Sequence, residues 1–199
     1  MQRYTVRLAE EADIDGLPEI ERAAAQRFFP YLKQLEISAG LLEGLTPVSF
    51  LRRARYERRL WVAVSTDENQ RLVGFIVAKF LPNSCFIVEL SVHPSHGRQG
   101  VGSALVEACC MGALTRNVQQ VTLTTFRYIP WNIPFYQQLG FRELNARYWS
   151  PEIRAIVQHE ARYGFAQQHR TVMIRPARRG LSTTLLSEIP AEISVEQEG

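Results

Sequence analysis

The sequence predicts one domain of the mixed α/β class. Its 199 residues include 46% hydrophobic amino acids, which suffices for one buried core, so a second domain would be unusually small. Runs rich in β-branched and aromatic residues alternate along the chain with stretches of helical hydrophobic spacing. Between residues 92 and 105 an apolar strand passes through a glycine-rich turn into a helix. Such alternation of strands and helices is typical of α/β domains.

The first half of the chain predicts a strand, several helices and a three-stranded meander. Residues 4–8 alternate as a short strand, and Asp13 is expected to cap a helix whose apolar positions keep helical spacing as far as Phe28. Residues 32–59 predict one or two shorter helices. The meander strands are expected at residues 61–64, 72–80 and 86–92.

The second half predicts a long helix followed by alternating short elements. The long helix begins at Gly100 and ends near Asn117. The later elements are a strand at 121–126, a helix at 131–139, a strand at 141–148, a helix at 151–163 and a strand at 170–175. Because aromatic residues disappear beyond Pro176, we expect residues 1–175 to form the domain and residues 176–199 a flexible tail or a strap across a partner.

The charge distribution argues against a nucleic-acid partner. The formal net charge is +3, and Lys33 and Lys79 are the only lysines. The densest basic run, residues 52–59, is interrupted by Tyr56 and Glu57, which favours a solvated helix face over a phosphate-binding surface.

Cysteine and histidine spacing predicts neither disulfides nor a metal site. Cys85, Cys109 and Cys110 are odd in number and two are adjacent, so they are interpreted as small buried hydrophobes. His93 and His96 lack the further ligands that a zinc site needs. Since no run resembles a signal peptide or a membrane span, we expect a soluble, cytoplasmic protein without a membrane partner.

The turn before the long helix has the features of a phosphate cradle. Gly97, Gly100 and Gly102 allow a tight turn with inward N–H groups, the helix dipole attracts anions, and Arg98 adds a positive charge. The order G-x-x-G-x-G differs from the dinucleotide fingerprint, and the Walker ending is absent. By itself this turn fits a phosphate site and an ordinary helix start equally well.

Residues 88–141 together resemble the GNAT superfamily of acyl-CoA-dependent N-acyltransferases. The matching features are the strand 88–92 with His93-Pro94 after it, the glycine loop, the helix through Val101, Leu105 and Ala108, and the tyrosine-to-Gly-Phe segment 134–141. Weaker similarity extends over residues 3–175. The resemblance implies a mixed, mostly antiparallel sheet of six or seven strands with helices on both faces, splayed near Val92 to admit acetyl-CoA.

The resemblance also implies how the cofactor binds. The strand backbone at 90–92 would pair with the pantetheine arm, and the loop backbone at 98–103 would hold the pyrophosphate. Where the family places Gln or Arg, this chain has Gly97, so Arg98 is expected to contact phosphate. The expected cofactor-binding residues are Leu90, Ser91, Val92, Arg98, Gln99, Gly100, Val101, Gly102, Ser103, Asn132 and Phe135.

Glu89 is the candidate general base. Simple alternation puts apolar side chains at 86, 88, 90 and 92 on one face of the strand, and Cys85, Ile87, Glu89 and Ser91 on the other. A carboxylate in a covered strand is costly unless it is paired, hydrated or used. It is therefore either satisfied by an arginine or by water, or it removes the proton from the attacking amine.

Tyr136 occupies the family's tyrosine position, where the phenol can donate to the departing CoA sulfur; otherwise it is a core aromatic beside Phe135. The family often has an asparagine seven residues earlier, which is Ile129 here. Asn132, four residues earlier, is the candidate replacement for a cofactor hydrogen bond.

The acceptor is expected to be a small-molecule primary amine, attacked directly in a ternary complex. An acidic group among aromatic side chains can hold an organic cation. The alternatives are a protein N-terminus or lysine as acceptor, or a non-catalytic acyl-CoA-binding module, and a homodimer is possible through the tail and the last strand. The candidate acceptor-binding residues are Glu21, Phe28, Phe29, Tyr31, Tyr148 and Trp149.

Overall fold

A computed structural model describes residues 3–67 and 70–178. Of the predicted tail, 176–199, only the first three residues are described: Pro176 ends the last strand and Ala177 is buried, and the rest lies outside the described residues. The seven strands of these ranges form one sheet in the order β1-β2-β3-β4-β5-β7-β6. Their bounds are β1 Tyr4–Leu8, β2 Leu60–Ser65, β3 Leu72–Phe80, β4 Cys85–Val92, β5 Gln120–Phe126, β6 Arg142–Glu143 and β7 Arg170–Pro176. All neighbouring pairs are antiparallel except β4 and β5, which are parallel. The predicted fold class is confirmed.

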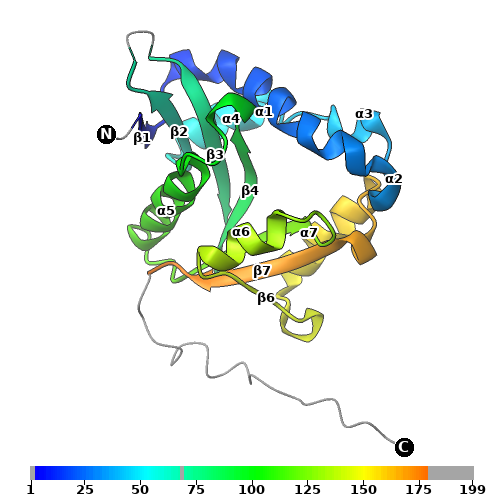
Figure 1. The fold of residues 1–199 in the computed structure, drawn as a ribbon. Helices are drawn as coiled ribbons and strands as arrows, with labels where there is room; N and C mark the ends of the chain where they lie inside the picture. The colour runs from blue at the N-terminus through cyan, green and yellow to red at the C-terminus, as the bar shows by residue number, and fades with distance from the viewer. Residues whose placement is uncertain (1–2, 68–69, 179–199) are drawn as a thin grey trace, which may run out of the picture.

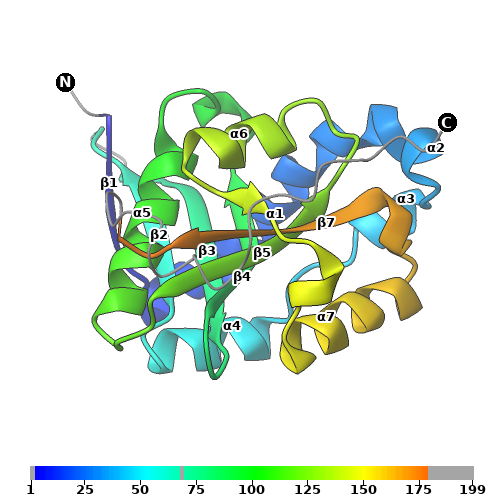
Figure 2. The same cartoon turned by 90° about the horizontal axis from the view of Figure 1, so that it is seen from below.

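Helices cover both faces of this sheet (Figures 1 and 2). Apolar side chains of α1 (Leu17–Ala25) and α4 (Val48–Tyr56) pack with β2 and β3 on one face, and α7 (Pro151–Arg162) packs there against β7. On the opposite face lie α5 (Val101–Leu114) and α6 (Asn132–Gln138). Two short helices, α2 (Leu32–Leu35) and α3 (Ala39–Leu42), follow α1 beyond a 3-10 segment at Gln26–Tyr31.

The start of the first helical segment differs from the prediction because Asp13 is not the N-cap. The segment begins as a 3-10 turn, Glu11–Gly16, with Glu10 as its N-cap. The Asp13 carboxylate accepts the Glu10 backbone N–H at 2.7 Å and pairs with Arg7 at 2.6 and 2.9 Å. Asp13 therefore closes a capping box from inside the turn.

The predicted strand at 141–148 is wrong over most of its length, because only Arg142–Glu143 pair with β7. The chain then turns into a 3-10 segment, Ala146–Tyr148, whose N-cap Asn145 accepts the Arg147 N–H at 3.1 Å. A local side-chain hydrogen bond thus competes successfully with the sheet.

A β-bulge at Val88 changes which side chains share a face of β4. Val77 of β3 lies opposite Glu89, but the next residue, Ala78, lies opposite Ile87, so Val88 is an extra residue. Ile87 therefore packs in the α5 core, whereas Glu89 shares the α1 face with Val77. The expectation that Cys85, Ile87, Glu89 and Ser91 share one face is wrong for this reason.

The same point of the sheet is where β4 and β5 separate. They pair only at Cys85–Val121, Phe86–Thr122 and Ile87–Leu123. The splay that was expected near Val92 therefore begins directly after Ile87, and Figure 1 shows β4 and β7 running at a wide angle beyond it. Within the described ranges, the β4 backbone from Val88 to Val92 pairs with β3 alone.

The three cysteines are free and buried, as expected, with the Cys85 and Cys109 sulfur atoms 3.7 Å apart. Among the described residues, no helix has the length and apolar character to cross a membrane.

Candidate active site

The glycine loop places an open helix end beside the gap between β4 and β5. Gly100 is the N-cap of α5, with a left-handed φ of 84°, and no side chain caps this end. The first N–H groups of a helix have no acceptor within the helix. The N–H groups of Val101, Gly102 and Ser103 are thus available to an anion, and no acidic residue lies in this first turn.

Two glycines of the loop meet neighbours that a larger residue would disturb. A Cβ at Gly100 would lie 3.0 Å from the Tyr4 hydroxyl oxygen, and one at Gly102 would lie 3.2 Å from Cζ of Phe135. Phe135 of α6 thereby touches the first turn of α5. A cradle of backbone N–H groups with this close approach fits a pyrophosphate.

The order Gly97-Arg98 at the loop entrance has a structural consequence. Gly97 has an ordinary φ of −63°, whereas Arg98 takes the left-handed φ of 58° that usually favours glycine. The left-handed conformations at Arg98 and Gly100 belong to the turn that leads the backbone into α5. The Arg98 side chain is exposed at its mouth.

Glu89 lies just beyond the bulge, on the face that α1 covers. Its Oε1 accepts a hydrogen bond from the Ser91 hydroxyl at 2.8 Å. Burial raises the pKa of Glu89, and the Ser91 hydrogen bond and the positive charge of Arg170 oppose this only in part. Arg170 itself pairs with Glu160, at 3.1 Å. Glu89 is thus a carboxylate with no directly bonded arginine among the described residues.

Glu21 brings a second carboxylate to the same region from α1. Its side chain is buried and accepts the Thr46 backbone N–H at 3.0 and 3.1 Å and the Thr46 hydroxyl at 2.9 Å. Burial and the nearby negative charge of Glu89 raise the pKa of Glu21 to about 7. Near neutral pH the two carboxylates resist ionising together.

Tyr136 comes from α6 on the other side of the gap. Its ring packs edge-on against Phe135 and Phe141, with centroids 5.0 and 5.6 Å apart. Burial and the charge of Glu89 raise the pKa of Tyr136, which keeps the phenol protonated. The phenol is therefore a hydrogen-bond donor whose pKa responds to the charge of Glu89.

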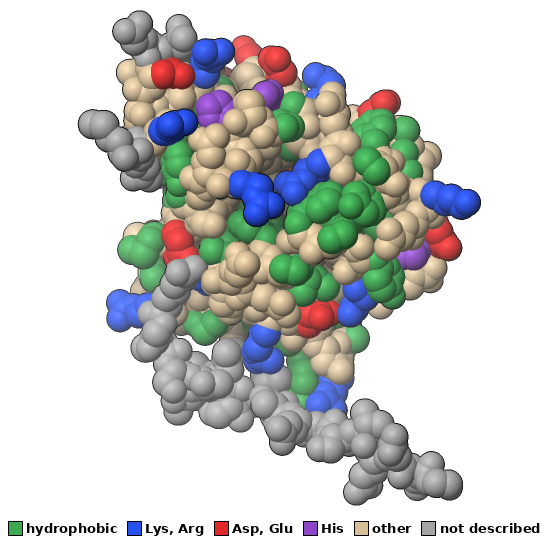
Figure 3. Space-filling view, in the orientation of Figure 1, with side chains coloured by type: hydrophobic (Ala, Val, Ile, Leu, Met, Phe, Trp, Pro, Cys, Tyr) green, Lys and Arg blue, Asp and Glu red, His purple; other side chains and the backbone are tan. Residues whose placement is uncertain are grey.

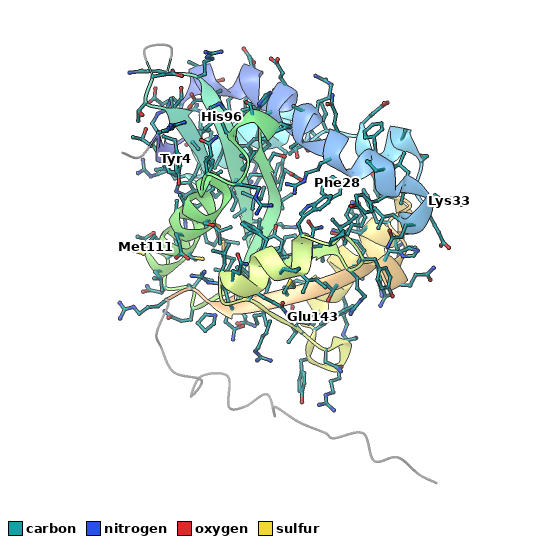
Figure 4. All side chains as sticks on the ribbon, viewed as in Figure 1. Tyr4, Phe28, Lys33, His96, Met111 and Glu143 are labelled. Carbon is teal, nitrogen blue, oxygen red and sulfur yellow. The ribbon has the colours of Figure 1, made fainter. Side chains whose placement is uncertain are left out.

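Aromatic side chains from the segment after α1, from β5 and from the start of α6 pack together as an aromatic wall. Phe28 packs on Phe126 and Trp131 at centroid distances of 5.6 and 5.8 Å, and Tyr31 meets Trp131 edge-on at 5.3 Å. Figure 4 shows Phe28 between the α1 segment and α6. Phe29 is exposed.

The other predicted site residues occupy two further places. Tyr148 and Trp149 pack in the core under α7, where the Trp149 indole N–H donates to the Leu144 carbonyl at 2.9 Å. Asn132 is buried at the start of α6, in front of Phe135. Of the acceptor candidates, Phe28 and Tyr31 thus belong to the aromatic wall and Tyr148 and Trp149 to the α7 core, while Glu21 lies on α1 and Phe29 is exposed.

Three residues of this region were missed in the sequence: Thr46, Arg170 and Arg27. Arg27 lies over the Trp131 ring, with Cζ 4.2 Å from its centroid. Arg170 donates to Thr124 at 2.8 Å as well as to Glu160. Their sequence neighbours carry no motif, because each is brought to the site by tertiary packing alone.

Comparison with known proteins shows the family. The model of the acetyltransferase (GNAT) family matches residues 23–141 of this chain. The fold is similar to that of the ribosomal-protein-S18-alanine N-acetyltransferase from Escherichia coli, with 18% identity, TM-score 0.57, and coverage of 87% of this chain and 94% of that one.

Two further structures share the fold. The PaiA N-acetyltransferase from Thermoplasma acidophilum, solved with coenzyme A, has 15% identity, TM-score 0.60, and coverage of 87% and 98%. An acetyltransferase of the GNAT family from Staphylococcus aureus Mu50 has 14% identity, TM-score 0.61, and coverage of 88% and 99%. Together with the family match over residues 23–141, the glycine loop and the splayed sheet identify this chain as a member of the GNAT acetyltransferase family.

Proposed function

We propose that this protein transfers an acetyl group from acetyl-CoA to a primary amine, by direct attack in a ternary complex. The observation that carries this proposal is the electrostatic interaction between two groups on either side of the gap between β4 and β5. The Glu89 carboxylate and the protonated Tyr136 phenol come from opposite sides of the gap between β4 and β5, close enough for the charge of one to raise the pKa of the other.

The cofactor site would use mainly backbone groups. The N–H groups from Arg98 to Ser103 would hold the pyrophosphate, with the Ser103 hydroxyl beside them. The strand backbone at residues 90–92, free of β5, would pair with the pantetheine arm. Phe135 and Asn132 would line the same channel from α6. Acetyl-CoA, when bound, supplies an activated thioester.

Glu89 would prepare the amine. An ammonium has no lone pair, so a base must take its proton before attack. The raised pKa of Glu89 makes this carboxylate a better base than an exposed one, and a positioned base contributes roughly 10² to 10⁴ in rate. Tyr136 would donate its proton to the departing sulfur, which limits the negative charge that develops there.

A small-molecule amine is the acceptor we favour. The aromatic wall of Phe28, Tyr31 and Trp131 includes two residues of the helical segment that follows the Glu21 helix, and aromatic rings together with a carboxylate suit an organic cation. The electrostatic contact between Glu89 and Tyr136 argues for an enzyme rather than a non-catalytic binding module.

The first test is isothermal titration with acetyl-CoA and with free CoA, on the wild type and on Gly100→Glu. We expect binding in the wild type and its loss in the variant, because a carboxylate in the cradle repels phosphate. Gly140→Glu is the matched control, since Gly140 has a similar left-handed φ of 85° and a side chain there meets no atom within 4 Å. Absence of binding in the wild type would contradict the proposal.

The second test is release of free thiol with a panel of primary amines, on the wild type, Glu89→Gln and Tyr136→Phe. The proposal expects turnover in the wild type and a loss in both variants with acetyl-CoA affinity retained. Equal turnover in all three proteins would exclude the assigned roles.

A further inference from the structure

Arg27 is a cation at the edge of the active site without an anionic partner. Within residues 3–67 and 70–178 its guanidinium forms no ion pair; it only stacks on Trp131 at 4.2 Å. The residue is exposed, so a ligand can reach it. Figure 3 shows Lys or Arg side chains beside a hydrophobic patch in the middle of this face of the molecule.

Stacking on Trp131 orients Arg27 without using its hydrogen-bonding capacity. A guanidinium over a ring engages its flat face, while its N–H donors point outward in the plane. This planar fork matches a carboxylate, which it can bind through two parallel hydrogen bonds. Arg27 is thus arranged as an anion-binding group.

The position of Arg27 relative to the carboxylates defines two poles. Glu21 and Arg27 lie on one continuous helical segment, six residues apart, which separates their backbones by about 9 Å along the axis. The charge of Arg27 also acts on the Tyr136 phenol, as does that of Glu89. The Tyr136 phenol is therefore within reach of a negative pole at Glu89, which has Glu21 nearby, and of two positive charges, of which Arg170 is paired with Glu160 and Arg27 is the positive pole.

We infer that the acceptor is a primary amine that also carries a carboxylate, with its ammonium toward Glu21 and Glu89 and its carboxylate on Arg27. This inference rests on the proposed function and names its substrate class. A simple cationic amine would leave Arg27 without a partner and would bring a second positive charge toward it. A peptide N-terminus also lacks the anion, because its first carboxyl group is a neutral amide.

The test compares matched amines that differ only in the carboxylate. L-lysine and L-tyrosine are compared with their amides and with cadaverine and tyramine, by kcat/KM for thiol release. The same pairs are titrated into the CoA-loaded protein, which needs no turnover. We expect the free amino acid to exceed its amide by about 10-fold or more in both measurements, since a charged hydrogen-bonded pair is lost in the amide.

Arg27→Met, which keeps the stacked aliphatic stem, should lower kcat/KM of the free amino acids to that of their amides and so remove this preference. The matched control is Arg22→Met, an exposed arginine of α1, which should keep the preference.

Equal use of acids and amides by the wild type would overturn the inference. So would an equal fall for both in Arg27→Met, because that result indicates a structural role. The two failures can be told apart. If acetyl-CoA does not bind, the proposed function fails. If amines are acetylated without a preference for a carboxylate, only this inference fails.

Discussion

Two buried groups of charged side chains in this protein are built on opposite principles. Arg175 is 2% exposed, and its guanidinium donates to Glu107 at 2.9 and 3.2 Å and to the carbonyl oxygens of Leu139 and Ala177. The carboxylates of Glu21 and Glu89 instead bring together two groups of the same sign.

The difference separates a structural site from a reactive one. A buried cation that is paired and hydrogen-bonded recovers much of its lost hydration, so Arg175 can tie α5 and the end of α6 to β7. Two like carboxylates cannot offset their lost hydration in this way. Their ionisation is held back, which makes them proton acceptors of raised pKa. Substitutions in the two groups should therefore have opposite consequences.

The largest expected effect is catalytic. Glu89→Gln should lower kcat/KM by roughly 10² to 10⁴, because the amide cannot accept the amine proton. Melting temperature and acetyl-CoA affinity should change little. Glu19→Gln, an exposed glutamate of α1, is the control. A loss of activity that parallels a loss of folded protein would assign Glu89 to the structural class.

On the structural side, Arg175→Met should lower the free energy of unfolding by about 3 kcal/mol, because the carbonyl oxygens and Glu107 lose their buried donor. Urea denaturation measures this loss. Activity per folded molecule should stay near that of the wild type, and a selective loss of kcat would show that the two groups are not separate.

Glu21→Gln should act in the opposite direction and stabilise the protein at high pH. The pKa of Glu21 is raised from 4.5 to about 7, so between these values the folded state binds more protons than the unfolded state and stability falls as pH rises. Glutamine removes this loss. The free energy of unfolding of the variant should exceed that of the wild type by about 1–3 kcal/mol at pH 8 and by less at pH 5. If urea denatures the wild type and Glu21→Gln at the same concentration at pH 8, the raised pKa of Glu21 is contradicted.

The smallest effect is expected in the glycine loop. Because Arg98 has a left-handed φ of 58°, Arg98→Gly should be about 1 kcal/mol more stable than Arg98→Ala. Both variants remove the charge, so both should weaken acetyl-CoA binding equally in a titration. A difference in affinity between them would mean that the backbone conformation, rather than the charge, limits binding.

Local patterns predicted much of the fold. The strand expected at 72–80 has the bounds of β3, and the glycine loop and the helix after it lie where their residues indicated. These elements carry strong signals of their own: the apolar run from Leu72 to Ala78 in one case, and the glycines at 97, 100 and 102 before helical spacing in the other.

The features that were missed depend on contacts distant in sequence. The bulge at Val88 shows no glycine or other local sign, and it reverses the face of Ile87 relative to Glu89. Thr46 reaches Glu21 across 25 positions, and Arg27 meets Trp131 through packing of α1 near α6. The sequence could therefore nominate Glu89 and Tyr136, but not the neighbouring groups that shift their pKa values.

The most direct test of the contrast between paired and like charges is the titration of the Glu21 carboxyl, followed by the NMR resonance of its side-chain carbon, in the wild type and in Glu89→Gln. Burial and the negative charge of Glu89 together raise the pKa of Glu21 to about 7. Glutamine at position 89 removes this charge, so the pKa of Glu21 should fall in the variant. A pKa of Glu21 that stays in place, or that rises, in Glu89→Gln would contradict the account.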